Sequence, residues 1–257
     1  MDILLDSLSP LVGEFTLTEV KNGKSEILVQ EHNMIMNRAK QSLAEMLAGA
    51  KMGEVGNAYN IQPINRFELG SGSHSGLVKI DPVATLTKLR ALTNHTNVGA
   101  TTVDADKQVY RIDFDPFQTG VANTGGPNGT TLTQVTGTYV KEFDNSILFG
   151  ASRTPTALST GSNPSIVKIA FETSTDASGV YKSSIVYEIT IPELRANQAS
   201  GTYSPTNPVY YSEAGLFIRK GDLDTTLCNF DAFAIKTFPP RPKASDSKWV
   251  ISWKIIF

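Results

Sequence analysis

The fold is decided by Lys248-Trp249-Val250-Ile251-Ser252-Trp253-Lys254-Ile255-Ile256-Phe257, the last ten residues of the sequence. Large apolar side chains stand at the alternate positions 249, 251, 253, 255 and 257. Successive side chains of a β-strand point to opposite faces, so the stretch predicts a strand with one apolar face. Such a face is more typical of a buried core than of a sugar-binding tryptophan platform. The strand must therefore be covered, because an exposed apolar strand promotes aggregation.

Further strands are predicted by alternating or β-branched stretches along the whole chain, with most of them in the second half. Asn22-Gly23 separates two such stretches and tolerates positive φ at both turn positions, which predicts a β-hairpin. Residues 176–179 predict a second hairpin turn, and Pro239-Pro240-Arg241-Pro242 predicts an extended break. The predicted strands are residues 13–19, 25–31, 61–69, 109–114, 166–173, 185–191, 210–219, 227–238 and 248–257.

One amphipathic helix is predicted over residues 34–48, with Asn33 or Asn37 as its N-cap and Gly49 at its C-cap. Its apolar positions recur at helical spacing and must pack on the sheet or on a neighbouring subunit. Residues 84–92 fit either a short helix or a strand. The apolar helix positions are Ile35, Ala39, Leu43, Met46 and Leu47.

The predicted fold is mainly β, an antiparallel β-sandwich of jelly-roll type with one N-terminal helix and long polar loops. We expect residues 1–257 to form a single domain, with a hairpin–helix attachment at 1–53 and a loop-rich insertion at about 115–165. Two small domains are the alternative. Thr, Gly and Asn are abundant in residues 119–138, and residues 152–164 are also loop-like. Long loops on a β scaffold are common binding regions.

Composition argues against several classes of partner. Lys and Arg number 23 and Asp and Glu number 25, which gives a net charge of −2. This balance predicts neither a nucleic-acid binder nor a protein that binds anionic membranes. The sequence has no apolar run of transmembrane length and no signal-peptide pattern, so we expect the protein to be made and assembled in a cytoplasm. The single cysteine, Cys228, is expected to be a small buried side chain.

Motifs of known chemistry are weak in this sequence. Gly70-x-Gly72-x-x-x-Gly76 has the wrong spacing for a phosphate loop and predicts a flexible turn. His32, His74 and His95 do not have the spacing of a zinc site.

Two acidic pairs, Asp104 with Asp106 and Asp113 with Asp115, are interpreted mainly as solvated charges, with a metal or catalytic role as the minor alternative. The prediction is therefore a protein without catalytic residues, metal or cofactor.

Two groups of motifs resemble those of a known class of proteins. The first contains Gly13-Glu14-Phe15, Asn22-Gly23, His32-Asn33-Met34-Ile35, residues 39–49 and Phe67-Glu68-Leu69-Gly70-Ser71-Gly72. The second contains Tyr211-Ser212-Glu213-Ala214-Gly215-Leu216-Phe217, residues 232–240 and residues 249–257. In this order they resemble small virion structural proteins of tailed bacteriophages. The likeness covers about half of the chain and leaves out residues 100–165, and Ile235-Lys236 stands where that pattern commonly has an arginine.

The resemblance implies a non-enzymatic assembly protein of a tailed-phage virion, in the tail, baseplate, neck or fibre-attachment region. Its expected partners are other virion proteins and further copies of itself, with no nucleic acid and no membrane. The alternatives are a head decoration protein and a carbohydrate- or receptor-binding module, for which exposed loop tyrosines would be the sign. A glycan-degrading enzyme would need two carboxylates in a cleft. The predicted interface residues are Ile35, Leu43, Leu47, Asn128, Tyr203, Tyr210 and Arg241.

Overall fold

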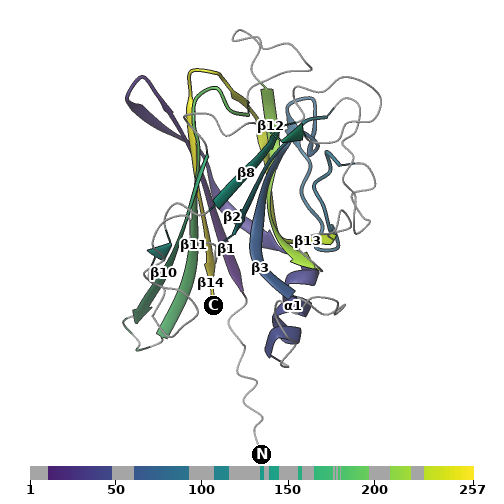
Figure 1. Cartoon of the computed structure of the whole chain (residues 1–257), viewed down its shortest axis with the longest axis vertical. Coiled ribbons are helices and arrows are strands. Elements are labelled where there is room, and N and C mark those ends of the chain that lie inside the picture. Colours follow the sequence, from purple (N-terminus) through teal and green to yellow (C-terminus); the bar gives the residue numbers. More distant parts are fainter. Residues whose placement is uncertain are drawn as a thin grey trace, which may run out of the picture.

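The computed structural model is mainly β, with one large curled antiparallel sheet (Figure 1). It describes residues 11–47, 61–92, 107–115, 134–135, 139–144, 156–157, 165–175, 177, 179, 181–196, 209–220 and 229–257. Within these residues α1 is the only helix, Asn37–Leu47. The strands are β1 Val12–Lys21, β2 Lys24–Ile35, β3 Ile61–Gly70, β4 His74–Ser75, β5 Val78–Lys79, β6 Val109–Asp115, β7 Gln134–Val135, β8 Tyr139–Asp144, β9 Thr156–Ala157, β10 Ile166–Thr175, β11 Tyr181–Ile191, β12 Val209–Lys220, β13 Asn229–Lys243 and β14 Lys248–Ile256.

The large sheet has the order β7-β10-β11-β14-β1-β2-β13-β12-β3-β6-β8-β9, and β4 and β5 form a separate pair. We call β10, β11, β14 and β1 the first half, and β13, β12, β3 and β6 the second half (Figure 1). The halves are joined through β2, which pairs with β13 at only two positions, Ile35 with Ala234 and Met34 with Ile235. Beyond this short ladder the sheet folds back on itself, and its two halves face each other.

The main core lies between the two halves. Aromatic rings meet across it, with centroids 5.9 Å apart for Phe15 and Phe238, 6.0 Å for Tyr211 and Trp249, and 6.2 Å for Phe114 and Tyr187. Each pair joins a strand of the first half to a strand of the second, so packing in the core holds the two halves of the sheet together.

The C-terminal strand agrees with its prediction. Four of its alternating side chains, Trp249, Ile251, Trp253 and Ile255, are fully buried. β14 pairs with β1 on one edge and β11 on the other, so neither edge is free. The fifth position, Phe257, follows the strand and is 43% exposed.

Both predicted hairpin turns are confirmed. Asn22 and Gly23 have φ of 53° and 74°, and the flanking Lys21 and Lys24 pair. Gly179 has a φ of 82° between the paired β10 and β11. The predicted strands are also present, with ends shifted by a few residues.

The predicted break at residues 239–242 was wrong, because β13 continues through it to Lys243. Thr237 pairs with Glu213 and Arg241 pairs with Tyr211, so three residues of β13 lie opposite one residue of β12. Proline lacks the N–H that a regular ladder needs, and such an irregularity removes that need.

The predicted helix begins too early in the sequence. Asn33, Met34 and Ile35 belong to β2, and α1 starts at Asn37, so an N-cap at Asn33 was wrong. Pairing of Met34 and Ile35 with β13 overrides the helical spacing of their side chains. Gly49 lies outside the described residues.

The remaining predictions are only partly tested. Residues 84–92 form turns and bends, neither of the two predicted elements. The two predicted loops contain the short strands β7 and β9, and the rest of both loops lies outside the described residues. The domain boundaries stay predictions.

Candidate interaction surface

Residues 71–92, which we call the outer segment, leave β3 and run over the side of the second half that faces away from the core (Figure 1). Their two ends are held by one buried carboxylate, that of Glu213 in β12. Glu213 accepts hydrogen bonds from Gly72 N at 3.1 Å, Ser73 Oγ at 2.6 Å, Arg90 N at 2.9 Å and Ala91 N at 2.8 Å. Burial raises the pKa of Glu213, and these four donors oppose that rise. We call this arrangement the Glu213 clamp.

Gly72 lets the two ends of the outer segment approach each other. A Cβ at this position would lie 2.2 Å from Ala91 N and 2.6 Å from Glu213 Oε1. The predicted flexible turn at residues 70–76 was therefore wrong for the part that meets the clamp. The missed signal was an acidic residue inside the apolar strand stretch Tyr211-Ser212-Glu213-Ala214-Gly215-Leu216-Phe217. Such a residue requires buried donors.

Between the outer segment and the sheet lies a second, smaller apolar cluster, separate from the main core. Leu86 and Leu89 of the segment pack there on Phe217 and Ile235 of the sheet. Two main-chain bonds add to the contact, from Asn37 N to Ala84 O at 3.0 Å and from Ala232 N to Thr87 O at 2.9 Å. The segment is thus attached along its second part as well as at its ends.

A buried ionic cluster occupies the same outer side of the sheet. Arg66 binds Asp113 through two hydrogen bonds of 2.5 and 2.9 Å, and Arg111 Nε binds Glu68 Oε1 at 2.8 Å. Each pair joins directly opposite positions of β3 and β6. The pairing satisfies charges that would otherwise be costly to bury. Asp113 is thereby an ion-pair partner rather than a solvated charge.

Lys88 of the outer segment is buried over this cluster. Its Nζ lies 5.9 Å from the ring centroid of Phe217, and the charges of Glu68 and Asp231 favour its protonated form. Burial nevertheless lowers the pKa of Lys88 to about 8. The segment therefore contributes a cation to a mostly buried group of opposite charges.

The outer segment also exposes apolar side chains to solvent. Leu77 is 83% exposed and Val78 is 70% exposed, and Ile80 and Val83 are exposed as well. Leu77 and Val78 belong to the β4–β5 hairpin, Ile80 follows it directly, and Val83 comes three residues after Ile80. We call these four residues the apolar hairpin surface. Contiguous exposed apolar groups commonly mark protein contacts.

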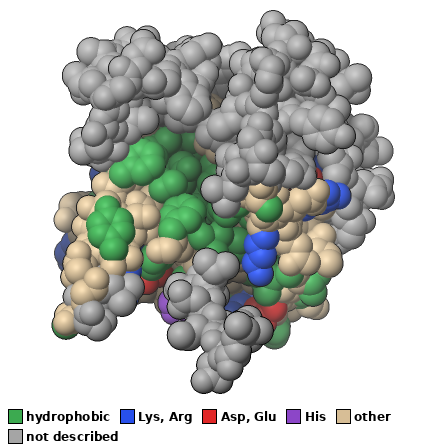
Figure 2. Space-filling view, turned by 90° about the horizontal axis from the view of Figure 1, so that it is seen from below, with side chains coloured by type: hydrophobic (Ala, Val, Ile, Leu, Met, Phe, Trp, Pro, Cys, Tyr) green, Lys and Arg blue, Asp and Glu red, His purple; other side chains and the backbone are tan. Residues whose placement is uncertain are grey.

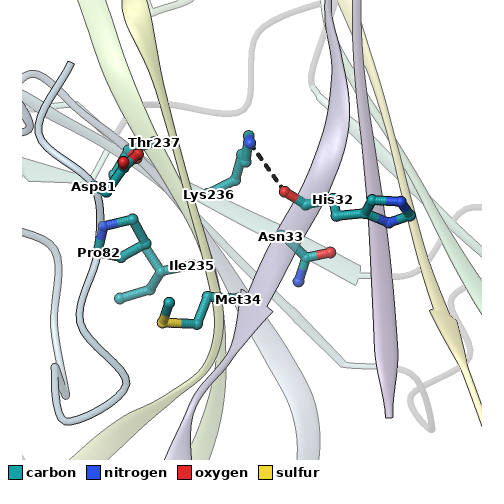
Figure 3. Close-up of a pocket in the computed structure, with 8 residues that line it drawn as sticks. All are labelled: His32, Asn33, Met34, Asp81, Pro82, Ile235, Lys236 and Thr237. Carbon is teal, nitrogen blue, oxygen red and sulfur yellow. Dashed lines mark hydrogen bonds between the residues drawn. The ribbon is translucent and has the colours of Figure 1, made fainter. Parts of the chain in front are cut away.

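A shallow groove of about 340 Å³ adjoins the outer segment where β2 leaves β13 (Figure 3). Lys236 bridges the two strands there, since its Nζ donates to Glu31 and, at 2.9 Å, to His32 O. The bond from Lys236 lowers the pKa of Glu31. Lys79 of β5 also reaches Glu31, at 3.4 Å. The lining residues are His32, Asn33, Met34, Asp81, Pro82, Ile235, Lys236 and Thr237.

Hydrophobic side chains also gather on the lower end of the molecule (Figure 2). One end of each of β10, β11 and β14 lies here in Figure 1, and Tyr181 at the start of β11 and Phe257 after β14 are exposed. Phe171, within β10, is exposed as well. Among the described residues, the apolar hairpin surface and this lower surface are thus separate, and the first of them is fastened by the Glu213 clamp.

The predicted interface residues that the structure describes do not form one exposed surface. Ile35 is buried in the main core, and Leu43 packs against that core from α1. Tyr210 is exposed on β12, and Arg241 Nη2 on β13 donates to Leu28 O at 3.1 Å. Leu47 ends α1, and nothing of its side chain is described; Asn128 and Tyr203 lie outside the described residues. Their role as interface residues stays a prediction.

Other predicted features have the following positions. His32 lines the groove, and His74 Nδ1 lies 2.9 Å from Gly76 O. In the part of the chain that the structure describes, no group of three or more acidic, histidine or cysteine side chains is placed to hold a metal ion. The helix α1, in the same part, is not of a length and apolarity that would cross a membrane. The remaining candidates, Cys228, His95, Asp104 and Asp106, lie outside the described residues.

Comparison with known proteins adds no assignment. No family model, no curated protein and no solved structure matches the chain.

Proposed function

We propose that the chain is a non-enzymatic structural protein of a tailed-phage virion, which self-assembles or docks on other particle proteins. The observation that carries the proposal is the apolar hairpin surface, an exposed apolar group on a segment fastened at both ends. A contact surface that is already ordered loses less conformational entropy on binding. Such a surface suits assembly from preformed subunits.

The phage assignment rests on the two groups of motifs and gains support from their positions. Gly72 belongs to the N-terminal group and Glu213 to the C-terminal group, and the two residues are hydrogen-bonded. Gly215 also belongs to the second group, and a Cβ there would lie 2.7 Å from the Phe217 ring. One residue of each group thus takes part in the Glu213 clamp.

Within this proposal the curled sheet is an antiparallel β-sandwich of jelly-roll type. The protein acts in the tail, baseplate, neck or fibre-attachment region, with head decoration as the alternative placement. It is assembled in the host bacterial cytoplasm and incorporated in the virion. Its partners are other virion proteins and further copies of the chain, with no nucleic acid or membrane.

A carbohydrate- or receptor-binding module is the second candidate function. The observation that favours it is the exposed Tyr210, whose partner on the adjacent strand is Pro242. An exposed aromatic ring can stack on a sugar. Retention of the chain on a bacterial surface polysaccharide, lost in Tyr210→Ala, would favour this candidate.

The proposal is tested by the solution mass of the chain, measured by light scattering at several concentrations. We expect a discrete oligomer, which the double variant Leu77→Asp/Val78→Asp shifts to lower mass because charges disrupt an apolar contact. Ile27→Asp is the matched control, since Ile27 is an exposed apolar residue of β2 outside the apolar hairpin surface. A monomer at every concentration would contradict self-assembly, and an equal effect of both changes would contradict this surface.

A further inference from the structure

We propose that the Glu213 clamp makes the outer segment a latch, whose two ends open and close together. The latch rests on hydrogen bonds within the chain. Its use in docking rests on the proposed function, because the latch then controls whether the apolar hairpin surface is in place.

Coupling between the ends follows from how the carboxylate is shared. Glu213 Oε1 accepts from Gly72 N and from Ala91 N, and Oε2 accepts from Ser73 Oγ and from Arg90 N. Each oxygen thus holds one donor from each end of the segment. A shift of the carboxylate that releases one end must also weaken the bonds at the other end.

The surroundings of the clamp make a half-open state unfavourable. Glu213 and Ser73 are buried, so a donor or acceptor that loses its partner there is not readily compensated by water. The close approach of Gly72 to Ala91 also places the two ends in direct contact. Buried polar groups in such a network are worth more together than separately.

Opening of the latch would change two surfaces at once. It would withdraw Leu86 and Leu89 from Phe217 and Ile235, and it would release the base of the β4–β5 hairpin. A partner that binds only the fastened hairpin therefore stabilises the closed latch by mass action. The latch is in this way a two-state element that docking can bias.

Hydrogen–deuterium exchange of the full chain, read by mass spectrometry in overlapping peptides, tests the coupling. Ser73→Ala removes one of the four donors, at one end only. We expect exchange to quicken at residues 90–92 by about the same factor as at residues 72–75, on the order of tenfold for one hydrogen bond to a charged carboxylate. Ser75→Ala is the matched control, because Ser75 is exposed on the same hairpin and makes no contact with Glu213.

Three results would overturn the latch: faster exchange only at the mutated end, an equal increase in β14 amides that signals general destabilisation, or no change. Glu213→Gln should accelerate both ends more than Ser73→Ala, and if that variant does not fold, Ser73→Ala decides alone. Coupled exchange in a chain that is monomeric by light scattering would keep the latch and remove its role in self-assembly. The two failures are thus distinguishable.

Discussion

The inner side of the curled sheet, which faces the main core, and the outer side of its second half are stabilised in different ways. The inner side faces the main core, where Phe15, Trp249 and Trp253 are fully buried among other apolar groups. The outer side is covered by the outer segment, where the ionic cluster and the Glu213 clamp provide directional contacts. Apolar burial scales with area and tolerates rearrangement, whereas a buried charge is strongly affected by the loss of one partner.

The difference indicates which side determines the global stability and which side determines how a surface segment is held. The inner side should set most of the global stability, because it buries the largest side chains. The outer side should set how firmly one surface segment is held. Substitutions on each side sharpen or break this distinction.

The largest effect is expected from Trp253→Ala on the inner side. Trp253 is fully buried, and its ring meets Phe15 edge-on at a centroid distance of 5.0 Å. Removing it should lower the free energy of unfolding by about 3–5 kcal/mol, measured by urea denaturation. Phe257→Ala is the control, because this half-exposed residue should cost well under half as much. Equal losses would contradict a core centred on β14.

A smaller loss, of about 3 kcal/mol, is expected from Arg111→Met on the outer side. The change leaves the carboxylate of Glu68, which is 1% exposed, without its hydrogen bond from Arg111. The double variant Arg111→Met/Glu68→Leu should recover most of that loss, because it removes both buried charges together. Urea denaturation of the two variants checks this, and a double variant no better than the single one would refute it.

The next effect concerns pH and Lys88, whose pKa is lowered to about 8 from the ordinary 10.5. Between these values the unfolded chain holds the proton and the folded chain has released it, so stability rises with pH over this window. The gain should approach about 3 kcal/mol, since one pKa unit corresponds to about 1.4 kcal/mol. Denaturation at pH 7.5 and pH 10 should show this rise, and Lys88→Met should reduce it. An unchanged slope in Lys88→Met would assign the rise to another group, such as Lys243.

The smallest effect is expected at the turn of the β1–β2 hairpin, which belongs neither to the main core nor to the outer segment. Gly23 has a φ of 74°, and a Cβ added there would meet open space, so Gly23→Ala introduces only backbone strain. The cost should be about 1 kcal/mol in the free energy of unfolding. Lys24→Ala, next to it, is the control and should have little effect. A loss at Gly23 as large as that at Trp253 would contradict a merely local role.

The sequence predicted the inner side better than the outer side. Alternation of large apolar residues in β14 and the Asn-Gly turn are local patterns, and each locates a strand or hairpin. Helical spacing misled the prediction at Ile35, where pairing with Ala234, far away in the sequence, decides the structure. The Glu213 clamp was not predicted, because its donors come from residues more than a hundred positions earlier. Only the unusual acidic residue in an apolar strand could have pointed to it.

The position of β14 has a consequence for biosynthesis. β14 lies between β1 and β11, so it completes a ladder with the first described strand of the chain and with another made much later. During translation β1 is made almost the whole described length before β14, and one edge of each neighbouring strand stays unpaired until then. Folding of the first half must therefore wait for nearly the whole described sequence, and pairing over such long separations is slow. A growing chain that exposes these edges is prone to aggregation until β14 has been made.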